Sequence, residues 1–562
     1  MSDRFPHASE SVFAVVVILL LLICVGCGGG GSSNSNSVTP PPAGPPAISS
    51  LSLSSGVVGQ PIKISGSNFG AAQGSSTVTF NGTPAGIGLW SNALIAATVP
   101  PGASNGNVVV TVGSSASNGV SFTVLPLSAG SIAPTNFGFQ CGPGDPADCQ
   151  GTGGLTDIVW PSTSAQPQLL RLHDAGTQWA NMNSADGTYN WQELDAWLDL
   201  LAQHPSVQVS QVFTWVPCWA APAPCTKPPT APNGTNTPPS DLGSGPQGSS
   251  PAFNKFVTAF VTHCSNAGNC VNKIIKYYEM WNEWDIRYHW TGTMAQVYQL
   301  VAYPTTIIRQ NVTGAVIMTP SATPFGDTGL PYQCDLQNWL NYETANGVIS
   351  DWVAWHDYLT KNDTSTVVPE VQFQQHDLSF LSVKNGGAAP GCTGNAPVGW
   401  SNAPWANTET NFDGAPPPGL NYTCPAAQFS ASDCTGQIVR WQLLHDSYGS
   451  SGLYWYKWNE TIGANTQYES AYFYMMQYLV GGKFDGSSPC QAITGTTVWT
   501  CPFTKQDGKT ALWVWTTDQS PATFQVPSGA GYSGYSDLTG TATPVSDGQS
   551  IQITVMPIML EQ

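Results

Sequence analysis

Between about Ser131 and Leu479, the chain alternates short apolar runs with longer segments in which apolar residues recur every three or four positions. A short apolar run bounded by turn residues is typical of a buried strand, and the longer spacing is typical of an amphipathic helix. Trp191, Leu194, Leu198 and Leu201 show the helical spacing. Strands that alternate with helices favour repeated βα units and a parallel sheet.

Strand-like runs occur at eight places: Asn136 to Gln140, Leu169 to His173, Val209 to Trp215, Ile274 to Trp281, Val316 to Pro320, Trp352 to His356, Trp405 to Glu409 and Gly452 to Trp458. Phe253, Phe256, Val257, Phe260 and Val261 mark a helix between two of them. Eight such units predict an α/β fold, a (β/α)8 TIM barrel. The Pro-rich stretch 222–251 is too long for a plain connection, so we expect it to be a loop on the functional face.

Alternating apolar and polar residues flank the barrel on both sides, as in Asn107 to Val112 and Ser550 to Val555. This pattern predicts a β-sandwich at each end. We therefore expect a signal segment at 1–27, a Gly/Ser/Pro-rich tether at 28–45, an N-terminal sandwich at 46–124, the barrel at 125–480 and a C-terminal sandwich at 481–562.

The N-terminal sandwich contains Gly-Ser-Asn-Phe-Gly at 66–70 and Val-Thr-Phe-Asn-Gly at 78–82. These segments resemble the immunoglobulin-like IPT/TIG module. Lys63 is its only charged residue. The module is interpreted as a spacer, and glycan binding is the alternative.

The first residues indicate export. Arg4 and His7 precede an apolar run from Val12 to Val25, which is short for a membrane span. The run ends in Ile-Cys-Val-Gly-Cys at 23–27, which resembles the lipobox of bacterial lipoproteins. That resemblance implies that Cys27 is acylated and anchors the chain in a membrane of the cell envelope. An uncleaved anchor or plain secretion are the alternatives.

The remaining cysteines also indicate an oxidising compartment. Apart from Cys24 and Cys27, the chain has twelve cysteines in loop-like contexts, which is typical of disulfides in exported proteins. Neighbours along the chain give the expected pairs: Cys141 with Cys149, Cys218 with Cys225, Cys264 with Cys270, Cys334 with Cys392, Cys424 with Cys434, and Cys490 with Cys501. Apart from Cys24 and Cys27 of the lipobox-like segment, no Cys-x-x-Cys or His-x-x-x-His spacing suggests a metal site, and we expect neither a metal nor a cofactor.

The net charge of the chain limits the classes of partner that it can bind. The 16 Lys and Arg against 34 Asp and Glu give a net charge of −18, which repels nucleic acid and anionic membranes. Only 9% of residues are charged, whereas aromatic residues are abundant. Such a surface suits an uncharged carbohydrate, because rings stack on sugars and amides and hydroxyls bind their hydroxyl groups. The sequence leaves the oligomeric state open.

Two glutamates carry the predicted chemistry. Glu283 follows the apolar strand at Ile274 to Trp281, and Glu409 ends the strand at Trp405. Burial of Glu283 at a strand end would keep it protonated near neutral pH. A protonated and an ionised carboxyl group are what retaining glycoside hydrolysis requires, and their expected separation is about 5 to 5.5 Å.

Trp-Asn-Glu at 281–283 on the fourth strand, with Thr-Glu at 408–409 on the seventh, resembles clan A of the glycoside hydrolases. Leu-Leu-Arg-Leu-His-Asp at 169–174, Gly-Thr-Tyr-Asn-Trp at 187–191 and the C-terminal sandwich are most similar to family 39, the xylosidase and iduronidase group. The resemblance implies that Glu283 is the general acid/base and Glu409 the nucleophile. Asn282 would bind the 2-hydroxyl of the sugar. The chain continues with Trp284, where clan members often have proline.

Further residues are assigned around this pair. Arg171, on a buried strand, needs a carboxylate partner, and Glu409 is the expected one. Tyr358 would donate a hydrogen bond to the same carboxylate. His173 and His356 would contact sugar hydroxyls, and Trp455 or Trp458 would form the apolar floor under the sugar ring.

The sequence therefore predicts an exported, surface-anchored retaining β-glycosidase that acts on a polysaccharide or oligosaccharide. The alternative is a surface glycan-binding or adhesion protein on a glycosidase-like barrel, because the tether, the TIG-like module and the aromatic residues also suit adhesion. Both glutamates are present, which favours the enzyme. A metal-dependent lyase or deacetylase is disfavoured because ligands do not cluster in the sequence.

Overall fold

The computed structural model describes residues 44–128, 130–141, 160–227, 234–245, 248–324, 326, 328–360, 369–413, 424 and 429–562. Pro45–Gln562 form one compact unit. The predicted signal segment, Cys27 and nearly all of the tether lie outside the described residues. Within the described part of the chain, no helix has both the length and the apolar character that a membrane crossing requires.

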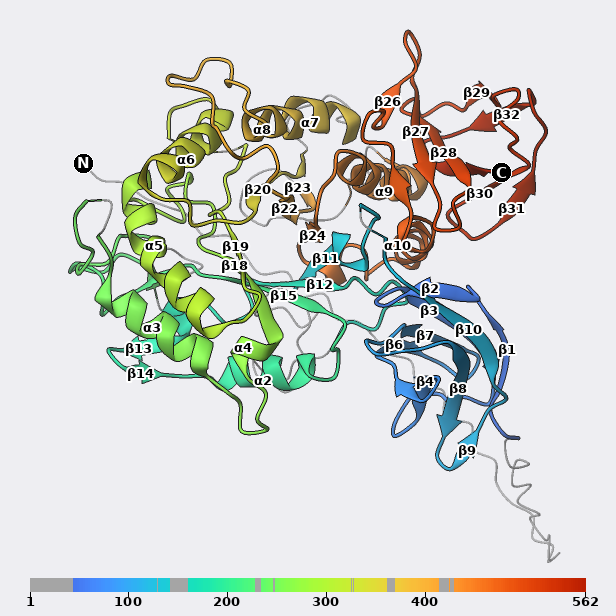
Figure 1. Cartoon of the computed structure of the whole chain (residues 1–562), viewed down its shortest axis with the longest axis horizontal. Helices are drawn as coiled ribbons and strands as arrows, with labels where there is room; N and C mark the ends of the chain where they lie inside the picture. Colours follow the sequence, from blue (N-terminus) through green and yellow to red (C-terminus); the bar gives the residue numbers. More distant parts are fainter. Residues whose placement is uncertain are drawn as a thin grey trace, which may run out of the picture. The chain divides into compact units, whose positions relative to one another are not determined.

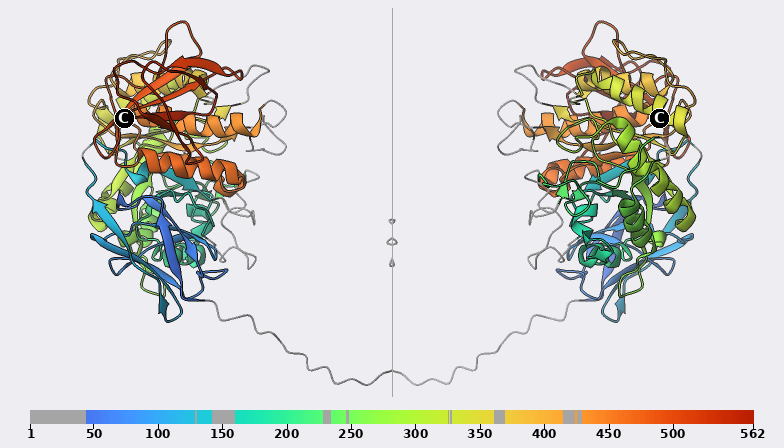
Figure 2. Two further views of the ribbon diagram at one scale, coloured as in Figure 1. Left: turned by 90° about the vertical axis from the view of Figure 1, so that its right-hand side faces the viewer. Right: turned by 90° about the vertical axis from the view of Figure 1, so that its left-hand side faces the viewer.

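The N-terminal module consists of strands alone, coloured blue in Figures 1 and 2. One sheet has the order β1-β3-β7-β6 and the other β2-β10-β8-β4-β5, with β9 paired to β8. Alternate residues such as Ile62 and Ile64, or Val108 and Val110, are buried in a shared core. The predicted β-sandwich is confirmed. Its strands are β1 (Ala47–Leu51), β2 (Ser55–Val57), β3 (Pro61–Ser67), β4 (Thr77–Phe80), β5 (Thr83–Pro84), β6 (Ile87–Trp90), β7 (Leu94–Thr98), β8 (Gly106–Val112), β9 (Ser115–Ala116) and β10 (Val120–Leu125).

The central sheet contains eight parallel strands at the predicted places. They are β11 (Phe137–Gln140), β12 (Leu169–Leu172), β15 (Gln208–Val212), β18 (Ile275–Glu279), β19 (Val316–Met318), β20 (Val353–His356), β22 (Trp405–Thr410) and β24 (Leu453–Trp455). Their order is β19-β18-β15-β12-β11-β24-β22-β20. Single bridges, Met318 to Trp352 and Ala322 to Trp355, join the two end strands. The sheet is thus a nearly closed, TIM-like barrel.

Helices follow the strands and lie outside them (Figure 1). Their apolar residues face the barrel: Leu194, Trp197, Leu198 and Leu201 of α2 are all buried. Ser250 caps α3 by accepting a hydrogen bond from the Phe253 amide. The helices are η1 (Pro134–Asn136), α1 (Trp179–Met182), α2 (Gln192–Leu201), α3 (Pro251–Thr262), α4 (Val271–Ile274), α5 (Met294–Asn311), α6 (Tyr332–Asn346), α7 (Pro369–Gln375), α8 (Asp377–Lys384), α9 (Ala431–Ser447), η2 (Trp458–Glu460) and α10 (Thr466–Leu479).

Three short strand pairs extend the loops of the barrel. They are β13 (Asn183–Ala185) with β14 (Thr188–Tyr189), β16 (Val216–Pro217) with β17 (Gly234–Thr235), and β21 (Leu359–Thr360) with β23 (Phe412–Asp413). The second pair includes part of the Pro-rich stretch that was predicted to be a functional-face loop. It starts beyond the carboxyl end of β15, so this stretch does follow a barrel strand.

The C-terminal segment, red in Figure 2, returns to strands. A seven-stranded sheet of order β25-β27-β28-β33-β30-β31, with β26 paired to β27, shares an apolar core with the pair β29-β32. This arrangement agrees with the predicted second sandwich. The strands are β25 (Lys483–Phe484), β26 (Gln491–Ala492), β27 (Val498–Thr504), β28 (Thr510–Thr516), β29 (Ala522–Gln525), β30 (Gly534–Ser536), β31 (Ala542–Pro544), β32 (Ser550–Ile553) and β33 (Ile558–Glu561).

Disulfide bonds join most of the predicted cysteine pairs. The structure contains Cys218–Cys225, Cys264–Cys270, Cys334–Cys392, Cys424–Cys434 and Cys490–Cys501. Cys149, the predicted partner of Cys141, lies outside the described residues. Five bonds of this kind are typical of a protein that matures in an oxidising compartment.

Candidate active site

The predicted site residues gather at the carboxyl ends of the barrel strands, where a TIM-like barrel builds its site. Arg171 lies on β12, His356 ends β20 and Glu409 lies on β22. Asn282 and Glu283 follow directly after β18. Residues that are up to 238 positions apart in the sequence therefore meet within one cluster.

Arg171 is the centre of this cluster and is fully buried. Its guanidinium group donates to both carboxylate oxygens of Glu279, at 2.8 and 2.9 Å, and to Glu409 at 2.5 Å. It also donates to the side-chain oxygens of Gln140 and Asn282, each at 2.7 Å. The predicted pair of Arg171 with Glu409 is present, but Glu279 makes the two-pronged contact. All nitrogen atoms of the guanidinium group are thus satisfied by acceptors.

Glu409 is held by two donors. Tyr358 donates a short hydrogen bond to one carboxylate oxygen, as predicted, and Arg171 binds the other. The side-chain oxygen of Asn407 accepts hydrogen bonds from the amides of Glu409 and Asp357, at 3.4 and 3.2 Å, which links β22 to the end of β20. Glu409 is only 7% exposed. These contacts fix the carboxylate and stabilise its charge.

Glu283 is also fixed, in an unusual backbone conformation with φ of +43°. Its amide donates to the Ser321 hydroxyl at 3.1 Å. One carboxylate oxygen is hydrogen-bonded to His356 Nδ1 at 2.7 Å, and the other lies 2.8 Å from His289 Nδ1. Left-handed residues other than glycine are strained and concentrate at functional sites.

The protonation state of Glu283 differs from the prediction. Burial works to raise the pKa of the Glu283 carboxyl, but the charges and hydrogen bonds of His289 and His356 outweigh it and hold the pKa well below the ordinary value. The prediction of a protonated Glu283 considered burial alone and is wrong for this arrangement. The two histidines, which supply the opposing effect, come from other parts of the chain.

His356 does not have the predicted contact with sugar hydroxyls. Its side chain is fully buried, between Glu283 and Arg171, with Nε2 lying 3.2 Å from the guanidinium group. Burial works to lower the pKa of His356, but the charge of Glu409 and the hydrogen bonds with Glu279 and Glu283 raise it to about 9. His356 is therefore a partner of the carboxylates, out of reach of a ligand.

Glu279 shows the opposite balance. Burial works to raise the pKa of this fully buried carboxyl, but the charge of Arg171 and the hydrogen bonds of His356 and Arg171 lower it to about 2. Glu279 is therefore ionised throughout the range in which proteins usually function. It neutralises part of the positive charge beneath the cluster.

Asn282 and His173 lie at the edge of the cluster. The side-chain oxygen of Asn282 is taken by Arg171, and its amide nitrogen lies 3.5 Å from His289 Nε2. His173 is 4% exposed. Its Nδ1 lies 3.5 Å from Asp174 Oδ1 and 4.0 Å from Glu409, whereas its Nε2 has no hydrogen-bond partner among the described residues. The unpartnered Nε2 can form a hydrogen bond to a ligand.

Neither tryptophan forms the predicted floor for a sugar ring. The side chains of Trp455 and Trp458 are both 0% exposed. Trp458 packs edge-on against Phe139 and Tyr472, and Trp455 packs against Phe412. The sequence could show that both residues close the eighth strand, but not that the core covers both faces of each ring.

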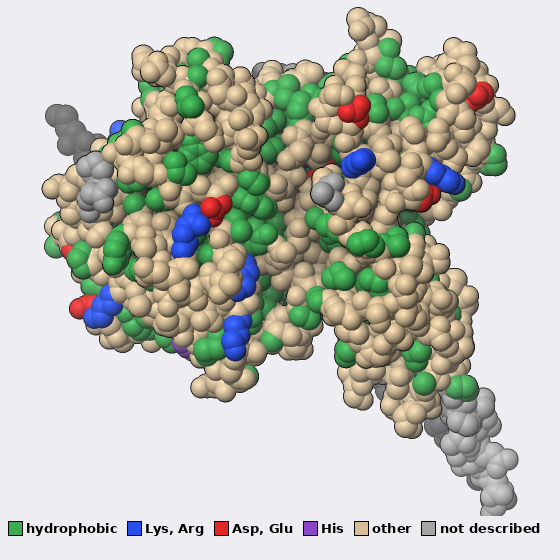
Figure 3. Space-filling model, in the orientation of Figure 1, with side chains coloured by type: hydrophobic (Ala, Val, Ile, Leu, Met, Phe, Trp, Pro, Cys, Tyr) green, Lys and Arg blue, Asp and Glu red, His purple; other side chains and the backbone are tan. Residues whose placement is uncertain are grey.

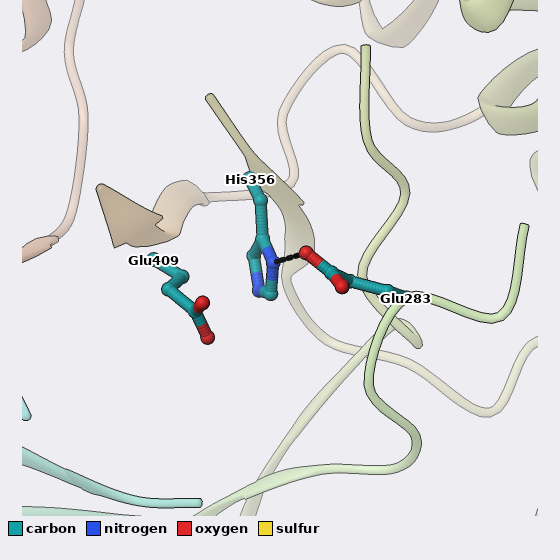
Figure 4. Close-up of side chains that lie close together, drawn as sticks. All are labelled: Glu283, His356 and Glu409. Atoms are coloured by element: carbon teal, nitrogen blue, oxygen red, sulfur yellow. Dashed lines mark hydrogen bonds and ion pairs between the residues drawn. The ribbon is translucent and has the colours of Figure 1, made fainter. Parts of the chain in front are cut away.

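The two predicted catalytic carboxylates lie close together. Ligand atoms of Glu283, His356 and Glu409 are all within 4.8 Å of one another, and Figure 4 shows His356 between the two glutamates. Two carboxylates and an imidazole could in principle ligate a metal ion. However, Arg171 already binds Glu409 and lies 3.2 Å from His356, and its fixed positive charge opposes a second cation.

The sequence of residues 46–124 matches the pattern of the IPT/TIG domain family. This segment is a TIG module. No curated protein matches the chain.

Several solved structures are similar in architecture. A family 39 glycoside hydrolase from Bacteroides cellulosilyticus has 12% identity and a TM-score of 0.48, over 92% of this chain and 99% of that one. A glucosidase from Croceicoccus marinus has 15% identity and a TM-score of 0.43, over 77% and 96%. The catalytic domain of a family 30 xylanase from Talaromyces cellulolyticus has 11% identity and a TM-score of 0.44, over 77% and 99%.

Two ionisable residues of the cluster, Glu279 and His289, were not predicted. Glu279 ends β18 between Tyr278 and Met280, and an acid among buried apolar neighbours was the available signal. His289 lies six residues after Glu283 in a loop, where no local pattern distinguishes it. Its position against Glu283 depends on the loop conformation.

Proposed function

We propose that this protein is a retaining β-glycosidase that hydrolyses a neutral polysaccharide or oligosaccharide. The observation that carries the proposal is the pair Glu283 and Glu409, with oxygens within 4.8 Å at the carboxyl end of the barrel. This proximity suits the separation of about 5 to 5.5 Å between the carboxyl groups of retaining enzymes and leaves too little room for the water that an inverting enzyme requires.

Glu409 would be the nucleophile. Tyr358 and Arg171 hold its two oxygens, so that an ionised carboxylate faces the anomeric carbon. Attack forms a covalent glycosyl-enzyme and breaks the bond to the leaving oxygen. Water then attacks the same carbon, restores the free carboxylate and releases a sugar with its original configuration.

Glu283 would protonate the leaving oxygen and then remove a proton from water. Because its pKa is lowered by His289 and His356, the dissociable proton belongs to the carboxylate–histidine group as a whole. His289 Nδ1 lies 2.8 Å from Glu283, within the reach of direct proton transfer. His356 Nδ1 also lies 2.7 Å from Glu283, and the pKa of His356 is raised to about 9. Activity should therefore decrease as pH rises through that range and the Glu283–His356 pair loses its proton.

The binding of the sugar would use Asn282 and His173. The amide nitrogen of Asn282 would donate to the 2-hydroxyl, a contact that strengthens in the transition state. His173, whose Nε2 has no hydrogen-bond partner among the described residues, would bind a second hydroxyl. The visible surface in Figure 3 is mostly uncharged, which suits a neutral substrate. We keep family 39 as the expected family.

The decisive test is the change Glu409→Gln, which keeps the shape of the side chain and removes the nucleophile. We expect kcat on aryl β-glycosides to fall at least about 10³-fold, while circular dichroism stays unchanged. Glu193→Gln, on α2, is the matched control and should retain full activity. Nuclear magnetic resonance of the first product should show retained configuration. Unchanged turnover of Glu409→Gln, or an inverted product, would contradict the proposal.

A glycan-binding or adhesion protein is the second candidate, favoured by the TIG module at 46–124. In that case the wild-type protein would bind polysaccharides without hydrolysing them. The same assay distinguishes the two functions, because a binding protein would release no reducing sugar at any protein concentration.

We also propose that the chain is exported and anchored through a lipid on Cys27, which the apolar run and the lipobox-like segment support. The five disulfides are consistent with export. Expressed in a bacterium, the wild-type protein should incorporate labelled fatty acid and sediment with membranes. Cys27→Ser should abolish labelling, whereas Cys24→Ser should not. Labelling of the Cys27→Ser variant, or a soluble wild-type protein, would refute the anchor.

A further inference from the structure

A cavity lies next to the residues that follow Glu283. Its volume is about 780 Å³, within the range of about 300–1,000 Å³ of small-molecule sites. The loop after β18, the start of α5, one face of α6 and residues 393–395 form its walls. Neither Glu283 nor Glu409 lines it. The cavity is therefore distinct from the carboxylate cluster.

The walls combine aromatic rings with uncharged polar groups. Trp284 and Tyr342 contribute rings, and Asn338, Asn341 and Asn395 contribute amides. This combination suits a sugar, since rings pack against its C–H face while amides bind its hydroxyl groups.

Charge argues against an anionic ligand. Arg287 is the single cation among the lining residues, and Asp285 and Asp335 are also in the wall. Asp335 offsets the charge of this arginine, and burial, together with the charges of Asp335 and Glu283, raises the pKa of the Asp285 carboxyl; the wall therefore has no surplus of positive charge to bind the phosphates of a nucleotide. A neutral ligand meets no such obstacle.

Two polar atoms in the wall residues are unsatisfied. The indole N–H of Trp284 and Oδ1 of Asp285 are buried and have no hydrogen-bond partner in the described part of the chain. The other oxygen of Asp285 accepts from the Thr323 amide at 2.8 Å. The Trp284 N–H is a donor. Burial, with the charges of Asp335 and Glu283, raises the pKa of Asp285, so its Oδ1 can donate when it carries the proton or accept when it is ionised. A hydroxyl group can satisfy both kinds, because it donates and accepts.

One wall is fastened to α6. The disulfide Cys334–Cys392 joins the loop to the helix. The amide of Asn341 donates to the Asn395 carbonyl at 2.7 Å, and Gln337 donates to the Thr393 carbonyl at 3.2 Å. These bonds hold the loop against α6 and keep the cavity open without a ligand, so less conformational entropy is lost on binding.

We propose that this cavity is a second carbohydrate site, which holds a sugar residue of a neutral glycan without cleaving it. The choice of sugar as the ligand rests on the proposed function. The site also gives a role to Trp284. Its ring packs against Trp339, with centroids 5.8 Å apart, and forms part of the cavity wall.

The test fills the cavity and measures binding without hydrolysis. Asn338→Trp, made in the Glu409→Gln background, would block the space, and Asn338→Ala would remove only the amide. Asn346→Ala, on the same helix but outside the cavity, is the matched control. The probes are soluble xylan, mixed-linkage β-glucan and galactomannan, each cast into a native gel for affinity electrophoresis.

We expect at least one probe to retard the control, and Asn338→Trp to weaken that affinity at least about tenfold, with a smaller loss for Asn338→Ala. Unfolding curves must show that the variants remain folded. If Asn338→Trp is unfolded, the affinity of Asn338→Ala tests the proposal instead. Equal affinity of variants and control would overturn the proposal, as would failure of every probe to retard any of them.

Kinetics separate this proposal from the proposed function. In the active protein, Asn338→Trp should leave kcat/KM on an aryl glycoside unchanged and raise KM on the bound polysaccharide about tenfold. If the active protein hydrolysed no substrate, the proposed function would be refuted. The gel experiment would still show whether the cavity binds a glycan. A KM effect that appears only above a certain oligosaccharide length would show that one chain reaches both sites. Binding without any KM effect would indicate a separate glycan.

Discussion

At the scale of single residues, the site is organised around one buried cation. Arg171 binds Glu279 and Glu409 together, so the charge of the candidate nucleophile is balanced by an arginine that a second glutamate holds in position. Removing one partner of a buried ion pair is strongly destabilising, because the other charge remains buried without compensation. Glu279 should therefore matter for stability although it would not touch a substrate.

Glu279→Gln should lower the free energy of unfolding by about 3 kcal/mol. The pKa of Glu279 is lowered from 4.5 to about 2 in the folded state, so its contribution is present above pH 4.5 and disappears as pH falls towards 2. Urea titrations at several pH values would measure it. Asp186→Asn, which breaks the exposed pair with Lys255, is the control and should change stability by less than about 1 kcal/mol. Similar losses in the two variants would contradict the prediction.

Much of this site could be predicted from single residues, and the predictions that were wrong share one cause. Arg171, Tyr358 and Glu409 were predicted in their actual contacts because each needs a partner of a definite kind. Glu283 and His356 were misjudged, since their states depend on each other. No pattern along the chain reports a contact between residues 73 positions apart.

At the scale of elements, all eight barrel strands were predicted, because each is an apolar run between turn residues. Their ends were less certain: β24 stops at Trp455, whereas the apolar pattern continues to Trp458. Trp458 lies instead in η2, after Lys457, which has a left-handed φ of +51°. The left-handed turn at Lys457 changes the direction of the chain without changing the run of apolar residues, so the sequence pattern does not reveal where the strand ends. The predicted boundaries between the domains stay predictions.

The disulfides also act at this scale, and their effects should differ with loop length. Cys334–Cys392 closes 58 residues and Cys264–Cys270 closes 6. Loop-closure entropy predicts that replacing both cysteines by serine lowers the free energy of unfolding by about 4 kcal/mol for the long loop and about 2 kcal/mol for the short one. Denaturant unfolding of the two double variants would measure both. An equal or reversed order would show that native contacts, and not loop entropy, dominate.

At the scale of the whole molecule, charge is divided between a buried cluster and a sparsely charged, acidic surface. Glu283 and Glu409 have side chains no more than 12% exposed, so dissolved ions screen them little. Acidic residues outnumber basic ones over the chain, whose net charge is −18, and the charges that are exposed repel one another through solvent. Salt should therefore affect stability and activity differently.

Between 0.05 and 1 M NaCl, we expect the midpoint of thermal unfolding to rise by about 2 to 5 °C, because screening weakens the repulsion. Over the same range kcat/KM on a neutral glycoside should change by less than about twofold. Sucrose at equal osmolality controls for exclusion from the surface. A fall in the midpoint, or a steep loss of activity, would contradict this division of charge.

Because the barrel is only nearly closed, its strand order predicts how the protein behaves when its backbone is cleaved. Strands β11 and β24, from the two ends of the barrel sequence, are joined along a continuous ladder, whereas β19 and β20 meet only at single bridges. The weakest joint of the ring thus lies in the middle of its sequence. A protease that cut between β19 and α6 would interrupt the chain beside this joint and leave the stronger ladders intact. The two fragments should stay together without a covalent backbone, which makes this barrel a natural candidate for fragment complementation.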